Sequence, residues 1–232
     1  MLEAIGIRAS YRGNGWRQEK KQVLKNINFT AEPGQCVGLI GANGTGKSTL
    51  LSVLAGIRKP DEGQLLFEGK DLLKKENSSL LKKISGYVPQ DNPLMEELTV
   101  FDNLKLWYLD KNRIEQELNA GILAEFGLEQ YLKTPVGKLS GGLKKRVSIA
   151  CALADNPKIL IMDEPTAALD MLCKHDIMNY IEKCKKTGKI IIFSTHDKTE
   201  LEICDKLYIL RSGELGEVSP GKSSKELIEL QK

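Results

Sequence analysis

The sequence has little of several features that would each point to a particular class of protein. Its five cysteines stand singly, with no Cys-x-x-Cys pair, so we expect reduced, mostly structural thiols and no metal cluster. No apolar run approaches the roughly 20 residues that cross a bilayer, and the start lacks a basic segment followed by an apolar one. The net charge of +3 is small and the basic residues are spread out, which argues against nucleic acid as a partner. These absences indicate a chain that is made and kept in the cytosol.

The composition that is present is that of a soluble globular protein. The chain has 232 residues, 41% apolar and 28% charged, enough for one large or two small domains with a sizeable core. Residues 2–11 and 23–31 carry apolar side chains at every second or third position, which is typical of strands in a half-exposed antiparallel sheet. Residues 12–22 between them predict a loop or a hairpin tip, and residues 32–34 predict a turn.

A glycine-rich stretch forms the strongest motif in the chain. It fits the pattern Gly-x-x-x-x-Gly-Lys-Ser/Thr and consists of Gly41, Ala42, Asn43, Gly44, Thr45, Gly46, Lys47, Ser48 and Thr49. A predicted strand at 36–40 precedes the stretch and a predicted helix at 50–56 follows it. A glycine-rich loop that merely turns the chain would not need Lys47 and Ser48 at the positions that the motif requires. Glycines let successive backbone N–H groups converge on one anion, and the helix adds the positive end of its dipole. The stretch therefore predicts a polyphosphate site in which Lys47 reaches the outer phosphates and the Ser48 hydroxyl binds Mg²⁺.

The remaining pattern predicts an α/β core that is interrupted by a helical block. Strands are indicated at 64–68, 84–88, 158–163, 189–193, 206–210 and 214–218, and helices at 171–186 and from Ser219 onward. From 91 to 156 the apolar residues recur with a helical period instead. We therefore expect a single domain with a mainly parallel sheet and an N-terminal antiparallel β-subdomain in residues 1–90 and 157–232. Residues 91–156 would form an inserted helical subdomain.

Three polar side chains follow the buried strands of the predicted core. Asp163 and Glu164 come directly after four apolar residues, where the carboxyl end of a parallel strand meets the ligand crevice, and not in the pattern of a surface acidic pair. Asp163 is the expected Mg²⁺ anchor, and Glu164 is placed to orient or deprotonate a water aimed at the terminal phosphate. His196 follows the strand at 189–193 and can hydrogen-bond a phosphate or that water. Tyr11, which ends the first strand, can stack on a purine, although a tyrosine there can also serve simple packing.

A second glycine-rich stretch lies in the helical block. Leu139 is followed by Ser140, Gly141 and Gly142, and these residues open a predicted helix, so they form a second potential anion site. The stretch is far from the first motif along the chain, and we do not expect one chain to bring both to the same phosphate. Two chains arranged head to tail could do so.

Over essentially its whole length the sequence resembles the ATP-binding cassette of ABC transporters. The matching segments occur in the family's order: the Walker A motif at 41–48, the Q-loop glutamine Gln90, the signature at 139–142, Walker B at 159–163, the catalytic glutamate Glu164, the D-loop at 167–170 and the switch histidine His196. Tyr11 matches the aromatic residue that stacks on the base. Two positions depart from the family pattern, since Leu143 stands where glutamine is usual and Ala167 where serine is usual.

The resemblance implies that two cassettes, either two copies or a copy and a homologue, sandwich two ATP molecules. Ser140, Gly141 and Gly142 would then contact the nucleotide of the partner, Gln90 would help to hold Mg²⁺, and His196 would contact the γ-phosphate. We expect these phosphate contacts to survive the two departures, which bear instead on the rate of hydrolysis and on coupling between the sites.

The resemblance also implies a membrane partner. Residues 93–107 supply more apolar surface than a small helical layer needs to bury, although each residue could equally belong to the helical core; they are Pro93, Leu94, Met95, Leu98, Phe101, Leu106 and Trp107. We expect an ATPase subunit that lies on the inner face of the cell membrane and drives a separately encoded permease. The absence of a C-terminal regulatory domain and the short helical block favour an exporter by analogy.

Other functions fit the sequence less well. A nucleotide-gated scaffold would bind ATP without turnover, which measurement with the membrane partner would reveal. A P-loop kinase would lack the signature at 139–142. Chromosome-maintenance relatives carry a long coiled coil and translation-factor relatives carry two cassettes, and neither feature is present.

Overall fold

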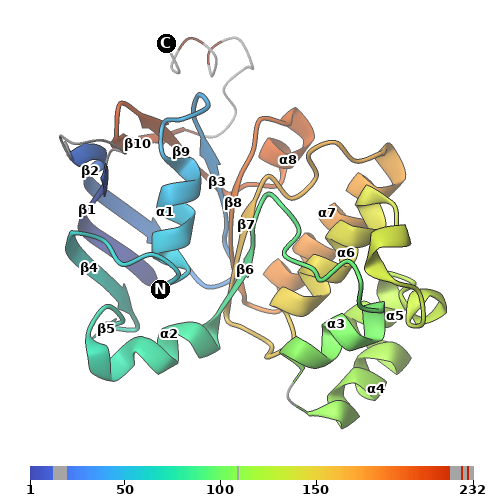
Figure 1. Ribbon diagram of the computed structural model, residues 1–232. Helices are drawn as coiled ribbons and strands as arrows, with labels where there is room; N and C mark the ends of the chain where they lie inside the picture. Colours follow the sequence, from blue (N-terminus) through green and yellow to red (C-terminus); the bar gives the residue numbers. More distant parts are fainter. Residues whose placement is uncertain (13–19, 109, 220–225, 227–228, 230–232) are drawn as a thin grey trace.

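The structure is a computed structural model that describes residues 1–12, 20–108, 110–219, 226 and 229. Two β-sheets and a group of helices make up this part of the chain (Figure 1). The predicted helix after Ser219 lies, except for Glu226 and Glu229, outside the described residues. No helix within the described ranges has the length and apolar character that a membrane span requires.

The first sheet is antiparallel and has four strands in the order β2-β1-β4-β5. They are β1 (Leu2–Arg12), β2 (Lys20–Ala31), β4 (Glu62–Phe67) and β5 (Lys70–Asp71). The sequence predicted β1 and β2 but started β2 too late, because Lys20, Lys21 and Gln22 pair with the end of β1. The predicted loop at 12–22 is wrong at both ends for this reason, and residues 13–19 lie outside the described part of the chain.

The second sheet is mainly parallel and has six strands in the order β10-β9-β3-β8-β7-β6. They are β3 (Cys36–Ile40), β6 (Ser85–Val88), β7 (Ile159–Asp163), β8 (Ile190–Ser194), β9 (Lys206–Arg211) and β10 (Glu214–Val218), of which β10 runs antiparallel along the edge. Every residue of β3, β7 and β8 is buried, as near-continuous apolar runs predict for central parallel strands. Asp163 and Leu39 both pair with Ser194, so the carboxyl ends of these three strands lie together.

The parallel sheet separates two hydrophobic cores. Alternate residues of its central strands, such as Ile161 and Ile192, pack with the antiparallel sheet and with helix α1 (Lys47–Leu54) in one core. The residues between them, such as Leu160 and Phe193, pack in the other core with the helical region and with α7 (Met171–Lys186). The period of two along each strand thus assigns successive side chains to opposite layers.

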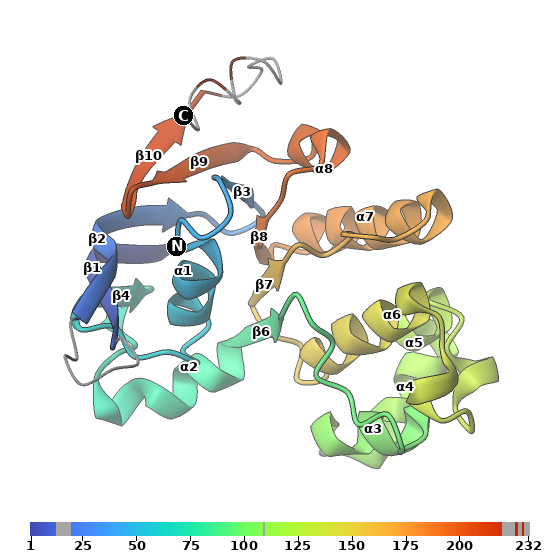
Figure 2. The ribbon, with the colours of Figure 1, turned by 45° about the horizontal axis from the view of Figure 1, so that its top comes forward.

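The helical region stands apart from α1 on the other side of the parallel sheet (Figure 2). It consists of α3 (Val100–Trp107), α4 (Lys111–Ala120), α5 (Ile122–Glu125) and α6 (Gly141–Ala152), with short 3₁₀ turns at Glu129–Tyr131 and Val136–Lys138. Outside it lie two helices that the sequence reasoning missed. They are α2 (Ser78–Ile84), which follows the 3₁₀ turn Lys75–Asn77, and α8 (Lys198–Glu202), which precedes β9.

Candidate active site

The glycine-rich loop joins the buried strand β3 to helix α1, which confirms the predicted strand, turn and helix. Gly41, Gly44 and Gly46 have φ angles of 152°, 78° and 109°, a region that residues with a Cβ rarely occupy. Gly46 is the N-cap of α1, so the helix begins at Lys47, three residues before the predicted start at position 50. The loop closes on itself where the Thr45 hydroxyl donates to the carbonyl oxygen of Ala42 at 2.8 Å.

The ammonium group of Lys47 lies inside this loop. Lys47 is only 6% exposed, and its Nζ donates to the carbonyl oxygens of Gly41 at 2.6 Å and Ala42 at 3.3 Å. Burial lowers the pKa of Lys47, while the negative charges of Glu164 and Asp163 act in the opposite direction. The two acids therefore help to keep a positive charge at this position.

A pocket of about 380 Å³ opens beside the loop. Its lining includes nine of the predicted site residues, namely Tyr11, Asn43, Gly44, Gly46, Lys47, Ser48, Thr49, Gln90 and Glu164, together with Val23. A volume of this size is within the range of small-molecule sites. The structure thus brings the glycine-rich loop, the Gln90 segment and the acid after β7 to one concave surface.

Asp163 and Glu164 are held by a residue that the sequence reasoning did not single out. The hydroxyl of Ser194, at the end of β8, donates to Oδ1 of Asp163 at 2.5 Å and accepts the backbone N–H of Glu164 at 3.0 Å. Asp163 is 4% exposed, and Glu164 has a φ of 48°, an uncommon value for a residue with a side chain. A signal was present, because Ser194 is a polar residue at the end of an apolar run in the neighbouring strand.

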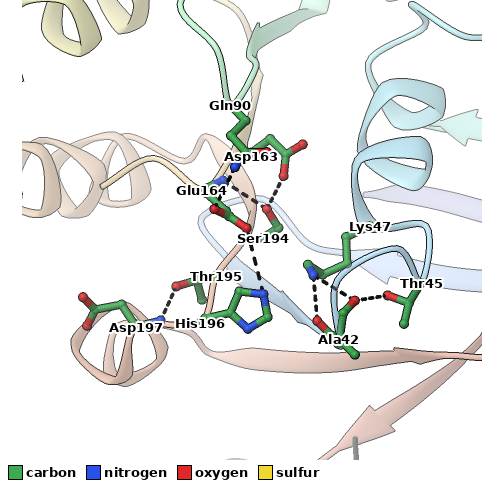
Figure 3. Close-up of polar contacts among 11 residues, drawn as sticks. Ala42, Thr45, Lys47, Gln90, Asp163, Glu164, Ser194, Thr195, His196 and Asp197 are labelled. Atoms are coloured by element: carbon green, nitrogen blue, oxygen red, sulfur yellow. Dashed lines mark hydrogen bonds and ion pairs between the residues drawn. The ribbon is translucent and has the colours of Figure 1, made fainter. Parts of the chain in front are cut away.

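The Glu164 carboxylate lies between two other predicted residues (Figure 3). Gln90 donates from Nε2 to its Oε2 at 3.2 Å, and Nε2 of His196 lies 3.9 Å from its Oε1. Burial and the positive charge of Lys47 lower the pKa of His196, and Glu164 opposes this shift. His196 itself lines a neighbouring pocket of about 240 Å³ that shares Glu164 with the first.

Tyr11 reaches the pocket from the end of β1. Its hydroxyl is 3.1 Å from Oγ1 of Thr49, and the Arg58 guanidinium carbon lies 3.9 Å from the centre of its ring. Arg58 is fixed in turn by donating to the carbonyl oxygen of Ser10 at 2.8 Å. The sequence reasoning did not predict Arg58, which holds the ring in place while Tyr11 remains 45% exposed.

The second glycine-rich stretch is not brought to this pocket. Ser140 is the N-cap of α6, where its hydroxyl accepts the backbone N–H of Leu143 at 3.3 Å, and Gly142 packs against Cys173 of α7. None of Ser140, Gly141 and Gly142 lines the pocket, and α6 belongs to the helical region across the sheet from α1 (Figure 2). One chain therefore does not join the two motifs, as we expected from the sequence.

The predicted Mg²⁺ ligands supply hard oxygen atoms. Ser48 offers a hydroxyl, Asp163 a carboxylate, and Gln90 an amide oxygen that stays available because the amide nitrogen donates to Glu164. The described residues contain no cluster of three or more His, Cys, Asp or Glu side chains suited to a metal.

Comparisons with known proteins agree with this geometry. The sequence profile of the ABC transporter family matches residues 24–167. The linearmycin resistance ATP-binding protein of Bacillus subtilis (strain 168) is 34% identical over 219 residues, which is 93% of this chain and 68% of that protein. The Nod factor export ATP-binding protein I of Rhizobium sp. (strain N33) is 38% identical over 205 residues, or 86% of this chain and 67% of that protein.

Solved structures show the same fold. The structure of an ATP-binding subunit of an ABC transporter has a TM-score of 0.85, is 30% identical and covers 100% of both chains. A dimeric ATP-binding cassette in a post-hydrolysis state, bound to ADP and Pi, has a TM-score of 0.85 at 27% identity and covers 96% of this chain and 100% of that one. The predicted fold class, a P-loop NTPase core with an antiparallel N-terminal sheet and an inserted helical region, is confirmed. The chain therefore belongs to the ABC transporter family, as an ATP-binding cassette with ATPase activity.

Proposed function

We propose that this chain is the motor of an exporter, in which two cassettes close around two ATP molecules and drive a separately encoded permease. The observation that carries the proposal is the separation of the two glycine-rich motifs, because Ser140 does not line the pocket that contains Lys47. A second chain, either another copy or a homologous cassette, would bring its own Ser140, Gly141 and Gly142 to that pocket. The names of the relatives, which refer to resistance and export, support the direction of transport.

Within one chain, different residues of the pocket would bind different parts of ATP. The Tyr11 ring would stack on the base, and the backbone N–H groups from Gly41 to Thr49 would surround the phosphates. Lys47, already held at the loop carbonyls, would place its charge on the outer phosphates. The buried position of Lys47 strengthens this interaction, since water screens it little.

Hydrolysis would take place between Glu164 and the end of the triphosphate. Mg²⁺, held by Ser48, Asp163 and Gln90, would offset the phosphate charge. Glu164 would accept a proton from the attacking water, and Gln90 fixes the orientation of its carboxylate. His196, adjacent to Glu164, would hydrogen-bond the γ-phosphate through its ring N–H.

The permease would dock beside the helical region. A groove of about 490 Å³ there is lined by Ile57, Pro89, Pro93 and Trp107, among others. Of the residues predicted to face a membrane partner, Met95, Phe101, Leu106 and Trp107 are 54%, 38%, 54% and 46% exposed, whereas Leu94 packs on the helical core. A cytoplasmic segment of the permease with apolar side chains fits this surface. The cassette would then lie on the cytoplasmic face of the membrane as one domain, with residues 91–156 as its helical subdomain.

The shared ATP site can be tested by measuring oligomeric state. The variant Glu164→Gln should elute as a dimer with ATP and as a monomer without it, because hydrolysis no longer reopens the closed form. Adding Ser140→Arg should return it to a monomer, whereas Ser79→Arg on the exposed face of α2 should not. Full turnover by a strict monomer would overturn the proposal.

A further inference from the structure

Lys145 of helix α6 makes an unusual contact with the loop that follows β6. Its side chain is only 4% exposed, and Nζ donates to the carbonyl oxygens of Pro89 at 3.1 Å and Gln90 at 3.0 Å. A buried ammonium group is unfavourable unless it is hydrogen-bonded, so both carbonyls are needed as partners. The contact therefore ties α6 to two consecutive peptide groups of this loop.

The two carbonyl groups belong to residues with different neighbours. Pro89 lines the groove of about 490 Å³ beside Trp107, and Gln90 lines the nucleotide pocket. The Gln90 side chain continues the connection, since it donates to Oε2 of Glu164 at 3.2 Å. A single lysine thus contacts two consecutive residues, of which the first lines the groove and the second lines the pocket.

Other contacts also hold α6 in place. The next residue, Arg146, bonds to Asp176 of α7 at 2.6 Å and to the carbonyl oxygen of Phe126 at 3.1 Å. The hydroxyl of Tyr108 donates to the carbonyl oxygen of Ala150 at 3.2 Å. These contacts join α6 to the helical region and to α7, whereas Lys145 joins it to the loop after β6.

Electrostatics support the placement of a cation here. Burial lowers the pKa of Lys145, and the nearby acids Asp163, Asp91 and Glu164 oppose that shift. Asp163 and Glu164 are the acids of the ATPase site, so the lysine and the site stabilise each other's charges.

We propose that Lys145 is a positioning residue for ATP hydrolysis, which holds the backbone of Pro89 and Gln90 where the Gln90 side chain can orient Glu164. The inference rests on the proposed function, in which Glu164 is the general base and Ser140, the N-cap of α6, contacts the partner's ATP. Through Lys145, helix α6, which would contact one ATP, positions Glu164 of the same chain, which would act on the other ATP. Lys145 itself touches neither nucleotide.

The first test compares kinetic constants. Lys145→Met, which keeps an unbranched apolar side chain and removes the donors, should lower kcat by about 10- to 100-fold, because a small misplacement of a reacting group has effects of that size. The KM for ATP should stay within about twofold, since the phosphate-binding loop is unchanged. Lys145→Arg, which can donate to both carbonyls, should recover most of the rate. The matched control is Lys144→Met, which removes a charge from the adjacent residue and should retain the wild-type kcat.

The second test asks in which chain Lys145 acts. Before ATP is added, a limiting amount of one chain is mixed with about a tenfold excess of a Glu164→Gln chain. By mass action, the limiting chain then enters mixed dimers with the excess chain. A limiting Lys145→Met chain should be slow, because its own Glu164 is mispositioned. A limiting wild-type chain mixed with an excess of Lys145→Met/Glu164→Gln should keep the rate that it has with Glu164→Gln alone.

The outcomes separate this proposal from the proposed function. The proposed role of Lys145 would be overturned by an equal loss of ATPase rate in both mixtures. It would also be overturned if Lys145→Arg did not restore kcat, or if Lys145→Met raised KM without changing kcat. If Lys145→Met does not fold, Lys145→Gln, which keeps an N–H donor, replaces it and should show an intermediate kcat. If Glu164→Gln never dimerises with ATP, the shared site is wrong, while the kinetic constants of the single variants still decide whether Lys145 positions Glu164.

Discussion

Ser194 donates a hydrogen bond to Asp163 across the neighbouring strands β8 and β7, with 2.5 Å between the two oxygen atoms. The two residues are 31 positions apart in the chain and are opposite each other in the parallel register. Because the same hydroxyl accepts the N–H of Glu164, one serine orients both acids of the site. The acids are thus positioned by the sheet itself, and catalysis benefits from groups that are in place before the reaction.

Replacement of Glu164 by glutamine should separate ATP binding from ATP hydrolysis. A general base contributes on the order of 10² to 10⁴ to a rate, so we expect kcat to fall by that factor. ATP affinity should persist, because the loop from Gly41 to Thr49 is intact. Phosphate release and nucleotide binding measure the two effects, and the exposed Glu129→Gln serves as control. Retention of wild-type turnover would exclude Glu164 as the base.

Tyr11 should contribute to binding of the base and not of the phosphates. Stacking of a base on an aromatic ring is worth about 1–3 kcal/mol, so Tyr11→Leu should weaken ATP binding by roughly 5- to 150-fold. Tyr11→Phe keeps the ring and loses only the contact with Thr49, and its effect should be smaller. Inorganic tripolyphosphate should bind equally to all three proteins in calorimetry. Equal weakening of both ligands by Tyr11→Leu would instead indicate a role in the shape of the loop.

The surroundings of His196 predict that the rate of ATP hydrolysis falls at acidic pH, which gives the pH profile an acid limb. Burial and Lys47 place the pKa of His196 below 6.5, so the ring is neutral near pH 7 and gains a proton only at lower pH. The protonated ring would attract the Glu164 carboxylate at 3.9 Å and compete with the attacking water. We expect kcat to be level from about pH 7 to about pH 8 and to fall below that range. In His196→Gln the activity should be lower throughout and this acid limb should be absent.

Trp107→Asp should impair docking of the permease without affecting the cassette. Trp107 is 46% exposed in the apolar groove, and loss of a buried aromatic anchor from an interface costs about 2 kcal/mol or more, roughly 30-fold in affinity. The basal ATPase rate and the melting temperature should be those of the wild type. Ile5→Asp, at another exposed apolar position, is the control. If Trp107→Asp joins the permease normally, Trp107 lies outside the interface.

Glu200 should make stability depend on pH. It is 3% exposed and accepts a hydrogen bond from Thr166, and burial raises its pKa above 4.5. An acid with a raised folded pKa favours the folded state while it is protonated. Its stabilising contribution is therefore present below the unfolded pKa and is lost as pH rises through the folded pKa. Glu200→Gln carries no such charge, so as pH rises above 4.5 its free energy of unfolding should fall less than that of the wild type.

Urea titrations at several pH values measure the effect of Glu200. The exposed Glu202→Gln on the same helix should follow the wild-type pH dependence. Identical slopes for Glu200→Gln and the wild type would show that Glu200 does not titrate differently in the folded state.

Part of this site could be predicted because it is encoded locally. The spacing of Gly41, Gly46 and Lys47 is a property of one short segment, and the apolar run before Asp163 identifies a buried strand without knowledge of its neighbours. Helix α2 was missed because its seven residues are too few to show a helical period, and no side chain caps its first turn.

The sequence by itself determined the glycine-rich loop and the acids at the strand end, since each depends on residues that are adjacent along the chain. It also determined the fold family, because several such local motifs occur in the family's order. Only the tertiary structure decided that Ser194 bridges Asp163 and Glu164, that Arg58 supports Tyr11, and that Lys145 reaches the Gln90 peptide. These pairs are distant in sequence, so their contacts follow from strand register and from the packing of α6 against the sheet. A hydrogen bond requires atoms to approach within about 3 Å, and no pattern of residue types along the chain specifies which distant side chains will meet that condition.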